Sequence, residues 1–599
     1  MVPSGALPEI SPEEIALVNE DVANGGIWYL SHFESEWTKN TASSSEDKRD
    51  VSATHYKINT NVAKGGGLAA NTEMEFTAIM PGARVLRIDL LPSLHVKRVT
   101  NEKGREIPFI QEKTSPFHII MPEPLEAGRK YMLSFEYEGN KVIQDEGGGN
   151  FSVGARSSWY PNVNAFLDHA TYDLKFRVPK RYTLVSVGKL VSESKDGDAL
   201  VTEWKSDVPI AVAGFNYGEF KKKKVSDELA NYELEVYTTE VPNTLARFKE
   251  QMSLTRSAMA ENALVDAQNS MRVYQKMFGD APFGRLAITQ QPAFNYGQSW
   301  PTLIYLPVSA FLDGTQRWSL MGGQAFRFSE FILEVTPHEV AHQWWGHMVG
   351  WASYHDQWLF EGFAEFSAGL LLEFTEKPAE VQKFWDRLHT EITEKNNFGI
   401  FANDAGPIWL GLRLHTPKTP GAYSRLVYPK GAYILQMIRM LMRDEKTGDQ
   451  DFSNMMKDYV KTHLYRNATS ESFLAVVSKH MKPMMDADGS HNMDWFKRDW
   501  IYGTDLPKCR LDYSLKPSAD GKVRLSAKLT ESDVSPDFIM RVPIYLDFDG
   551  RVIRAGSFLM RGNMTTSEIL MDLPKRPKRV LLNANHDVLA AETVVKEIP

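Results

Sequence analysis

The chain lacks the residues that cross-link small secreted folds. It contains a single cysteine, Cys509, among 599 residues. One thiol cannot form a disulfide within the chain, and it cannot build a cysteine-rich metal site. Any stable core or metal site must therefore rest on other side chains.

Long apolar runs and an excess of basic charge are also missing. No stretch reaches about 18 consecutive apolar residues, so we expect no transmembrane segment. The formal net charge is −8, which argues against nucleic acid as a partner. Residues 1–30 lack a basic start followed by an apolar core, so we expect no signal peptide in this sequence. A cytoplasmic location and export with a removed signal both stay open.

What is present is typical of a soluble, multidomain protein of the α+β class. Hydrophobic residues make up 43% and charged residues 24% of the chain, and its length predicts about four domains. Residues 1–50 begin with a serine cap and early acids, which favour a helical arm and a linker. Residues 51–224 alternate and predict an antiparallel β domain. Helical patterns dominate 225–505, and 506–599 return to the alternation expected of a β-sandwich.

The segment "TPHEVAHQWWGH" at 336–347 carries the strongest chemical signal. On a helix, His338 and His342 lie on one face, one turn apart, with Glu339 beside them. This H-E-x-x-H arrangement supplies two zinc ligands and a general base. A core helix with satisfied histidines is the alternative, so the motif needs a third ligand.

A following helix offers that ligand. A histidine six residues after His342 would complete one known pattern, but that position is Met348, and His347 comes one residue too early. His347 is therefore expected either at the surface or behind the ligands, where it would contact a metal ligand without binding the metal itself. The segment "HDQWLFEGFAEFSAGLLLEF" places Glu361 nineteen positions after His342. Together, two imidazoles and this carboxylate predict a catalytic site for one Zn²⁺ per chain.

These motifs resemble those of the zinc aminopeptidases of the alanyl aminopeptidase and leukotriene hydrolase type, the gluzincins. That family has H-E-x-x-H, eighteen residues and then E in W-L-x-E-G-F, and here "WLFEGF" follows at the same distance. It also carries Y-x-K-G on a later helix, matched by Tyr428 in "YPKG", with Tyr423 five positions earlier. The resemblance covers residues from about 55 to 599.

The resemblance implies a fold and a set of roles. We expect a thermolysin-like, mainly helical catalytic domain between the β domain and the β-sandwich. His338, His342 and Glu361 would hold zinc, Glu339 would act as general base, and Tyr428 would stabilise the transition state. Glu365, one turn beyond Glu361, is either a residue behind the ligands or part of a solvated helix face.

One family feature is absent. The family binds the substrate α-ammonium with a glutamate in G-x-M-E-N, whereas the corresponding stretch here, "QPAFNYGQSWPTLIYLP", has Ser299 at that place. Residues 281–312 contain no Asp or Glu. Gln298 can exchange hydrogen bonds but cannot neutralise an ammonium, and an unpaired buried cation is costly. Tyr296, Gln298 and Ser299 are nevertheless candidates for the substrate pocket. Ala368 replaces a further acid of the family.

Three hypotheses follow for peptide substrates. The first is an aminopeptidase whose amine-binding acid is elsewhere, with Glu330, Glu334 and Asp313 as candidates. The second is a zinc peptidase with the same machinery that accepts N-blocked or internal bonds. The third is a zinc-containing scaffold without catalysis. The sequence leaves side-chain preference, physiological substrate and oligomeric state open.

Overall fold

The structure is a computed structural model whose description covers most of the chain. The chain divides into two compact units, residues 1–353 with 463–467, and residues 354–462 with 468–599. The domain boundaries expected at 50, 224 and 505 stay predictions. The described backbone outside the N-terminal strands comprises residues 49–112, 117–154, 158–164, 167–239, 255–281, 283–291, 297–313, 316, 325–518 and 521–599, with side chains at 325–332 left out.

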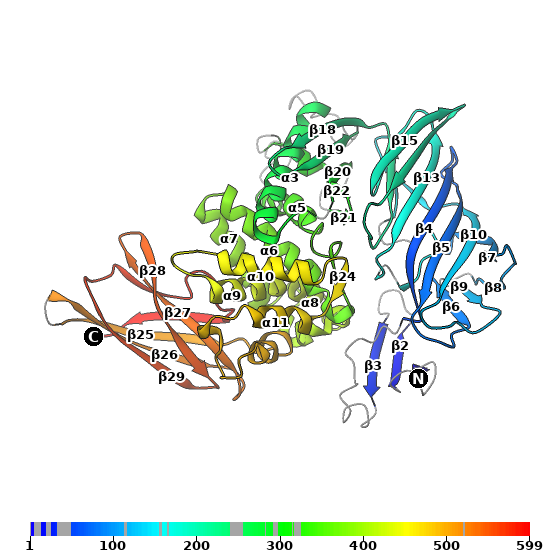
Figure 1. Ribbon diagram of the computed structural model, residues 1–599. Helices are drawn as coiled ribbons and strands as arrows, with labels where there is room; N and C mark the ends of the chain where they lie inside the picture. The colour runs from blue at the N-terminus through cyan, green and yellow to red at the C-terminus, as the bar shows by residue number, and fades with distance from the viewer. Residues whose placement is uncertain are drawn as a thin grey trace. The chain divides into compact units, whose positions relative to one another are not determined.

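A seven-stranded sheet forms most of the first unit's β domain (Figure 1). Neighbouring strands are antiparallel except for β13 and β4, which run parallel. Buried and more exposed residues alternate along β5, as a half-buried sheet requires. The β domain expected from the sequence is confirmed. In spatial order the strands are β15 (Lys189–Asp196), β16 (Ala199–Lys205), β13 (Thr171–Pro179), β4 (Val51–Val62), β5 (Leu68–Ala78), β10 (Lys130–Gly139) and β7 (Leu94–Asn101).

A second sheet of five strands carries the helices that lead to the motif. All residues of β20 and β22 are buried, as expected of parallel strands that are covered on both faces. Helix α3 (Arg256–Phe278) packs against α5 (Ala325–Ala341). The strand order is β18 (Lys221–Asp227), β19 (Tyr232–Thr238), β20 (Arg285–Gln291), β22 (Leu303–Pro307) and β21 (Gln298–Trp300), so β21 lies at the edge.

Helices dominate the first part of the second unit. Helix α6 (Trp358–Thr375) is buried from Trp358 to Leu372, because most of its residues are apolar and it packs among other helices. It contacts α9 (Gly431–Met442) and α7 (Pro378–Thr393). Helices α10 (Gln450–Thr462) and α11 (Ser470–Lys479) follow.

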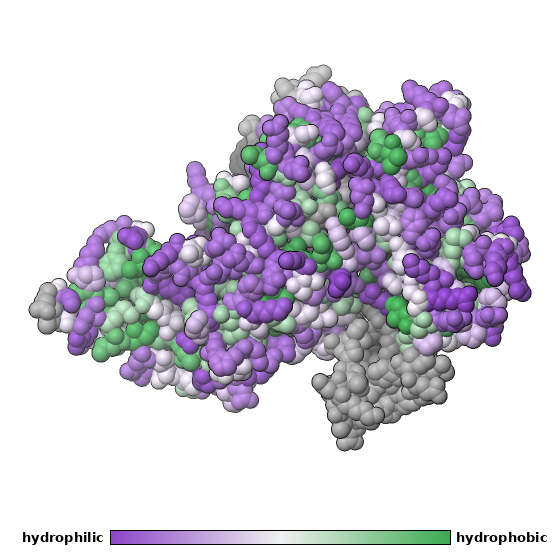
Figure 2. Space-filling view, in the orientation of Figure 1, coloured by the Kyte–Doolittle hydropathy of each residue, from purple (hydrophilic) through white to green (hydrophobic). Residues whose placement is uncertain are grey.

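The end of the chain forms two antiparallel-rich sheets, in agreement with the expected sandwich. Figure 2 shows hydrophilic residues over most of the visible face and hydrophobic residues gathered over these C-terminal strands. The first sheet has the order β29 (Thr565–Leu573), β26 (Val523–Ser532), β25 (Lys508–Pro517) and β31 (Glu592–Glu597). The second has the order β28 (Arg551–Arg561), β27 (Ile539–Phe548) and β30 (Arg579–Leu582).

The helical arm expected at residues 1–50 is wrong where the structure describes this segment. Three short strands, β1 (Val2–Ser4), β2 (Glu14–Asn19) and β3 (Gly26–His32), pair antiparallel. The stretches "EIALVN" and "GIWYLSH" are rich in β-branched and aromatic residues, whose preference for strands outweighs the serine cap and early acids. Within the described residues, no helix is long and apolar enough to cross a membrane.

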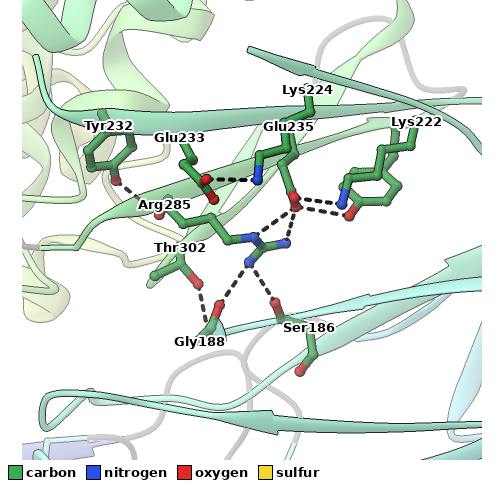
Figure 3. Close-up of polar contacts among 10 residues, drawn as sticks. Ser186, Gly188, Lys222, Lys224, Tyr232, Glu233, Glu235, Arg285 and Thr302 are labelled. Atoms are coloured by element: carbon green, nitrogen blue, oxygen red, sulfur yellow. Dashed lines mark hydrogen bonds and ion pairs between the residues drawn. The ribbon is translucent and has the colours of Figure 1, made fainter. Parts of the chain in front are cut away.

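A buried ion pair within the five-stranded sheet also links this sheet to the segment just before β15 (Figure 3). Arg285 on β20 donates from Nε to the Glu235 carboxylate on β19 at 2.8 Å. Its Nη1 donates to the carbonyl oxygens of Ser186, at 3.2 Å, and Gly188, at 2.9 Å, beside the seven-stranded sheet. Only 8% and 6% of the two charged side chains are exposed. Burial alone would raise the pKa of Glu235, but Arg285 and Lys222 outweigh it and hold this pKa below its usual value.

Replacing Arg285 by methionine should destabilise the first unit strongly. The substitution keeps much of the side-chain volume but leaves a buried carboxylate with one cation fewer and two carbonyl oxygens without their donor. We expect a loss of about 3 kcal/mol, since breaking a buried pair from one side is costly. Calorimetry would show this loss as a lower midpoint temperature for the unfolding of the first unit. Arg524→Met is the matched control, because Arg524 makes an exposed pair with Asp572, and its loss should leave the unfolding transition nearly unchanged. Equal effects of the two substitutions would contradict the assigned role.

Candidate metal centre

The two histidines lie at the C-terminal end of α5, as the helical spacing predicts. Their ring centroids are 4.8 Å apart. The helix ends at Ala341, but the amide of His342 still bonds to the carbonyl oxygen of His338 at 3.3 Å, which extends the turn. Tyr274 on α3 donates its hydroxyl to the carbonyl of Pro337 at 3.0 Å and holds this end of the helix.

The orientation of the second imidazole is fixed by the chain just after it. Nδ1 of His342 lies 3.1 Å from the carbonyl oxygen of Trp345. A proton on Nδ1 makes that hydrogen bond and leaves the lone pair on Nε2, the arrangement that metal-binding histidines commonly have. His342 is 3% exposed, so water does not compete for the ring.

The third side chain comes from the first turn of α6. One ligand atom each of His338, His342 and Glu361 lies within 4.8 Å of the others. His342 and Glu361 are buried, and His338 is partly exposed. Two imidazole nitrogens and one carboxylate oxygen are the donors of a catalytic zinc site, which keeps one position open. The donor set therefore fits zinc. In the described part of the chain, this is the group that meets the requirements for a metal site.

Glu339 lies on the same helix turn and is 7% exposed. Gly297, just before the edge strand β21, approaches it closely. A Cβ atom at Gly297 would lie 2.4 Å from Oε1 of Glu339. The glycine thus leaves room for the carboxyl group, a feature of the site that no sequence motif had indicated.

Tyr428 and Tyr423 lie together in the second unit. Tyr428 belongs to the turn η7 (Leu426–Lys430) and is partly exposed. Its ring centroid is 6.4 Å from that of Tyr423, with the planes at 80°. Tyr423 donates its hydroxyl to Oε1 of Gln357, just before α6, at 2.7 Å. This bond connects the tyrosine pair to the start of the helix that carries Glu361.

The substrate-side candidates on β21 are held in place by Gln343. Its side-chain amide donates to Oγ of Ser299 at 2.8 Å and to the carbonyl of Trp300 at 3.0 Å. Ser299 is 3% exposed. Gln298 is partly buried and donates to the carbonyl of Ser299 at 3.3 Å. Tyr296 lies outside the described residues.

The structure decides between the alternatives left open for two residues. His347, expected at the surface or behind the ligands, does not lie at the surface, because it is 5% exposed and its Nε2 lies 3.1 Å from the carbonyl oxygen of Ser299. Glu365 is 9% exposed, so it does not belong to a solvated face. Arg387 on α7 pairs with it at 3.4 Å. The sequence could not decide this, because the partner lies on another helix.

The expected amine-binding acids have different surroundings. Glu334 is buried at 9% exposure on α5, four residues before His338. Asp313 is exposed and accepts a hydrogen bond from the amide of Gln316 at 2.8 Å. The side chain of Glu330 lies outside the described residues. Of the two candidates whose side chains the structure describes, Glu334 is the buried one.

Comparisons with known proteins agree with this site. Residues 316–500 match the peptidase family M1 domain. The probable aminopeptidase 2 of Sulfurisphaera tokodaii is 23% identical over 65% of this chain and 45% of its own length. The human endoplasmic reticulum aminopeptidase 1 is 22% identical over 71% of this chain and 44% of its own. The chain thus spans less than half the length of these relatives.

Solved structures show the same fold. An M1 zinc metallopeptidase from Deinococcus radiodurans aligns with a TM-score of 0.56 at 19% identity, covering 77% of this chain and 96% of that chain. A two-domain M1 zinc metallopeptidase variant bound to L-arginine aligns with a TM-score of 0.55 at 18% identity, covering 72% and 91%. Residues 316–500 therefore resemble the M1 peptidase domain in sequence, and the fold resembles that of the M1 zinc metallopeptidases.

Zinc binding should depend on the three converging side chains. We expect about one zinc per chain by elemental analysis, and loss of most of it after His338→Ala, because two ligands do not hold the ion at a three-ligand site. His347→Ala is the matched control, since it removes a neighbouring buried imidazole outside the group. Equal zinc loss in both variants would contradict the assignment.

Proposed function

We propose that the protein is a zinc-dependent aminopeptidase that releases N-terminal residues from peptides. The observation that carries the proposal is the convergence of His338, His342 and Glu361. The neighbouring general-base candidate Glu339 and the match to the M1 domain support it. Aminopeptidases among the relatives support the N-terminal preference.

Within this proposal, Glu339 is the residue that moves protons. When bound, zinc supplies a Lewis acid that acidifies water and polarises a carbonyl. The Glu339 carboxylate takes a proton from the attacking water and later gives it to the leaving amine. Its burial at 7% exposure excludes bulk water from this exchange, and Gly297 leaves the space for the carboxyl group.

Tyr428 is the proposed donor to the oxyanion that forms during attack. A partly exposed phenol can reach substrate, and a hydrogen bond to developing charge lowers the barrier because the donor is already in place. Tyr423 packs against it and is held by Gln357. Tyr423 therefore acts on the position of Tyr428 in this proposal.

One observation favours a second specificity. The edge strand β21 presents Ser299, bound to Gln343, where the resemblance expects an amine-binding glutamate. A peptidase with a serine at this place lacks a negative charge that would stabilise a free α-ammonium. It therefore accepts N-blocked or internal peptide bonds more readily than a peptidase with a carboxylate there. Glu334 is the proposed substitute anchor if the enzyme requires a free amine.

Glu339→Gln should abolish peptide hydrolysis while zinc stays bound. The amide cannot accept the proton, so we expect kcat to fall by about 10² or more. Steady-state assays and elemental analysis of the same sample would show activity lost at unchanged zinc content. Full activity in this variant would rule out the proposed base, and activity absent from the wild type would favour the non-catalytic scaffold.

A paired substrate assay should separate the two specificities. Leucine p-nitroanilide would be compared with its N-acetylated form and with an internally quenched peptide. We expect kcat/KM to favour the free amine by about tenfold or more, equivalent to 1.4 kcal/mol for an ammonium contact. Glu334→Gln should reduce that preference. Equal rates for the free and acetylated substrates would overturn the aminopeptidase proposal in favour of the second specificity.

A further inference from the structure

The turn that carries Tyr428 is wider than an α-helical turn. In η7, the amide of Gly431 donates to the carbonyl of Leu426, five residues earlier. Pro429 lies inside this turn. Proline has no amide hydrogen and cannot form the normal bond to Arg425, so a π-type turn absorbs the defect. Tyr428 therefore has a position that a regular helix would not give it.

A contact between two glycines sets where this turn lies against α6. A Cβ atom at Gly362 would lie 2.7 Å from the Cα of Gly431 and 3.0 Å from the carbonyl oxygen of Val427. A Cβ atom at Gly431 would lie 2.9 Å from the Cα of Gly362. These obstacles are mostly backbone atoms, which cannot rotate away. The two backbones thus meet as closely as glycine allows.

The contact joins the two functional side chains directly. Gly362 follows the ligand Glu361, and Gly431 ends the turn that contains Tyr428. A shift at this crossing therefore changes the separation of Tyr428 from the carboxylate ligand. Glu361 directly precedes Gly362, and Tyr428 lies three residues before Gly431.

Lys430 holds the other side of the turn. Its side chain is fully buried, and Nζ donates to the carbonyl of Gly503 at 3.3 Å. Burial lowers the pKa of Lys430 to about 8, although Asp505 acts in the opposite direction. A buried amine with this bond ties the turn to the segment after η9 (Lys497–Ile501).

We propose that the Gly362–Gly431 contact and the Pro429 turn position Tyr428 for transition-state stabilisation. This inference rests on the proposed function. Gly362, Gly431 and Pro429 are positioning residues, because they act through the tyrosine. A misplacement of about 1 Å can cost on the order of 10² in rate, and a methyl group at Gly431 forces the backbones apart.

The test is a double-mutant cycle between Gly431→Ala and Tyr428→Phe. In the wild-type background, Gly431→Ala should lower kcat by about tenfold with little change in KM, since it disturbs a contact made in the transition state. In the Tyr428→Phe background, the same change should lower kcat by less than about twofold, because residues acting through one group are not additive. Zinc content should stay at the wild-type value.

Gly369→Ala is the matched control. This glycine lies on α6, as Gly362 does, and an added Cβ would lie 2.4 Å from the ring of Phe384, so the substitution disturbs the packing of α6 away from the Gly362–Gly431 contact. Any effect on kcat should be the same factor in both backgrounds. If Gly431→Ala fails to fold, Pro429→Ala replaces it, because restoring the amide lets the turn close to an α-helix and should give the same non-additive pattern.

Two results would overturn the inference while leaving the proposed function intact. One is an unchanged kcat in Gly431→Ala, and the other is an equal loss in both backgrounds. Full turnover by Tyr428→Phe would instead remove the assigned role of the tyrosine and the inference with it. A wild-type protein without peptidase activity would refute the proposed function itself.

Discussion

Three side chains that converge within 4.8 Å are the constraint on which the rest of the site depends. Two come from the end of one helix and the third from the start of another, so each helix end must be held. The hydroxyl of Tyr274 binds the carbonyl of Pro337, and the carbonyl of Trp345 orients the second imidazole. Burial makes these contacts effective, because the local dielectric is low and the ring cannot turn towards water.

The edge strand β21 is bonded to the segment that carries the two histidines. Gln343, the residue after the second histidine, binds Ser299 and Trp300 and so couples the metal-binding helix to the strand. Gly297 at the start of the strand leaves space for the Glu339 carboxyl. The metal-binding segment and the edge strand therefore share one connection. Ser299 stands about where the family resemblance implies a carboxylate, so binding of a free amine would need an acid from another part of the chain.

Local periodicity could be predicted from the sequence, whereas contacts between distant segments could not. The shared face of His338 and His342 follows from helical spacing, and the helical segment that follows offered Glu361 as the third ligand. The bond from Gln343 to Ser299 spans 44 positions, and no motif marks it. The first three strands could not be predicted from a serine cap and early acids, because β-branched and aromatic residues outweigh these signals. The position of Tyr428 depends on a π-type turn, which a single proline in the sequence does not predict.

The central claim is that one zinc ion sits among these three side chains. Anomalous diffraction from crystals of the purified protein, recorded on both sides of the zinc absorption edge, tests it most directly. The account predicts one strong peak at about 2.0–2.2 Å from a ring nitrogen of His338 and of His342 and from the Glu361 carboxylate. A zinc-bearing crystal with no peak there, or with its peak on other side chains, would contradict the account.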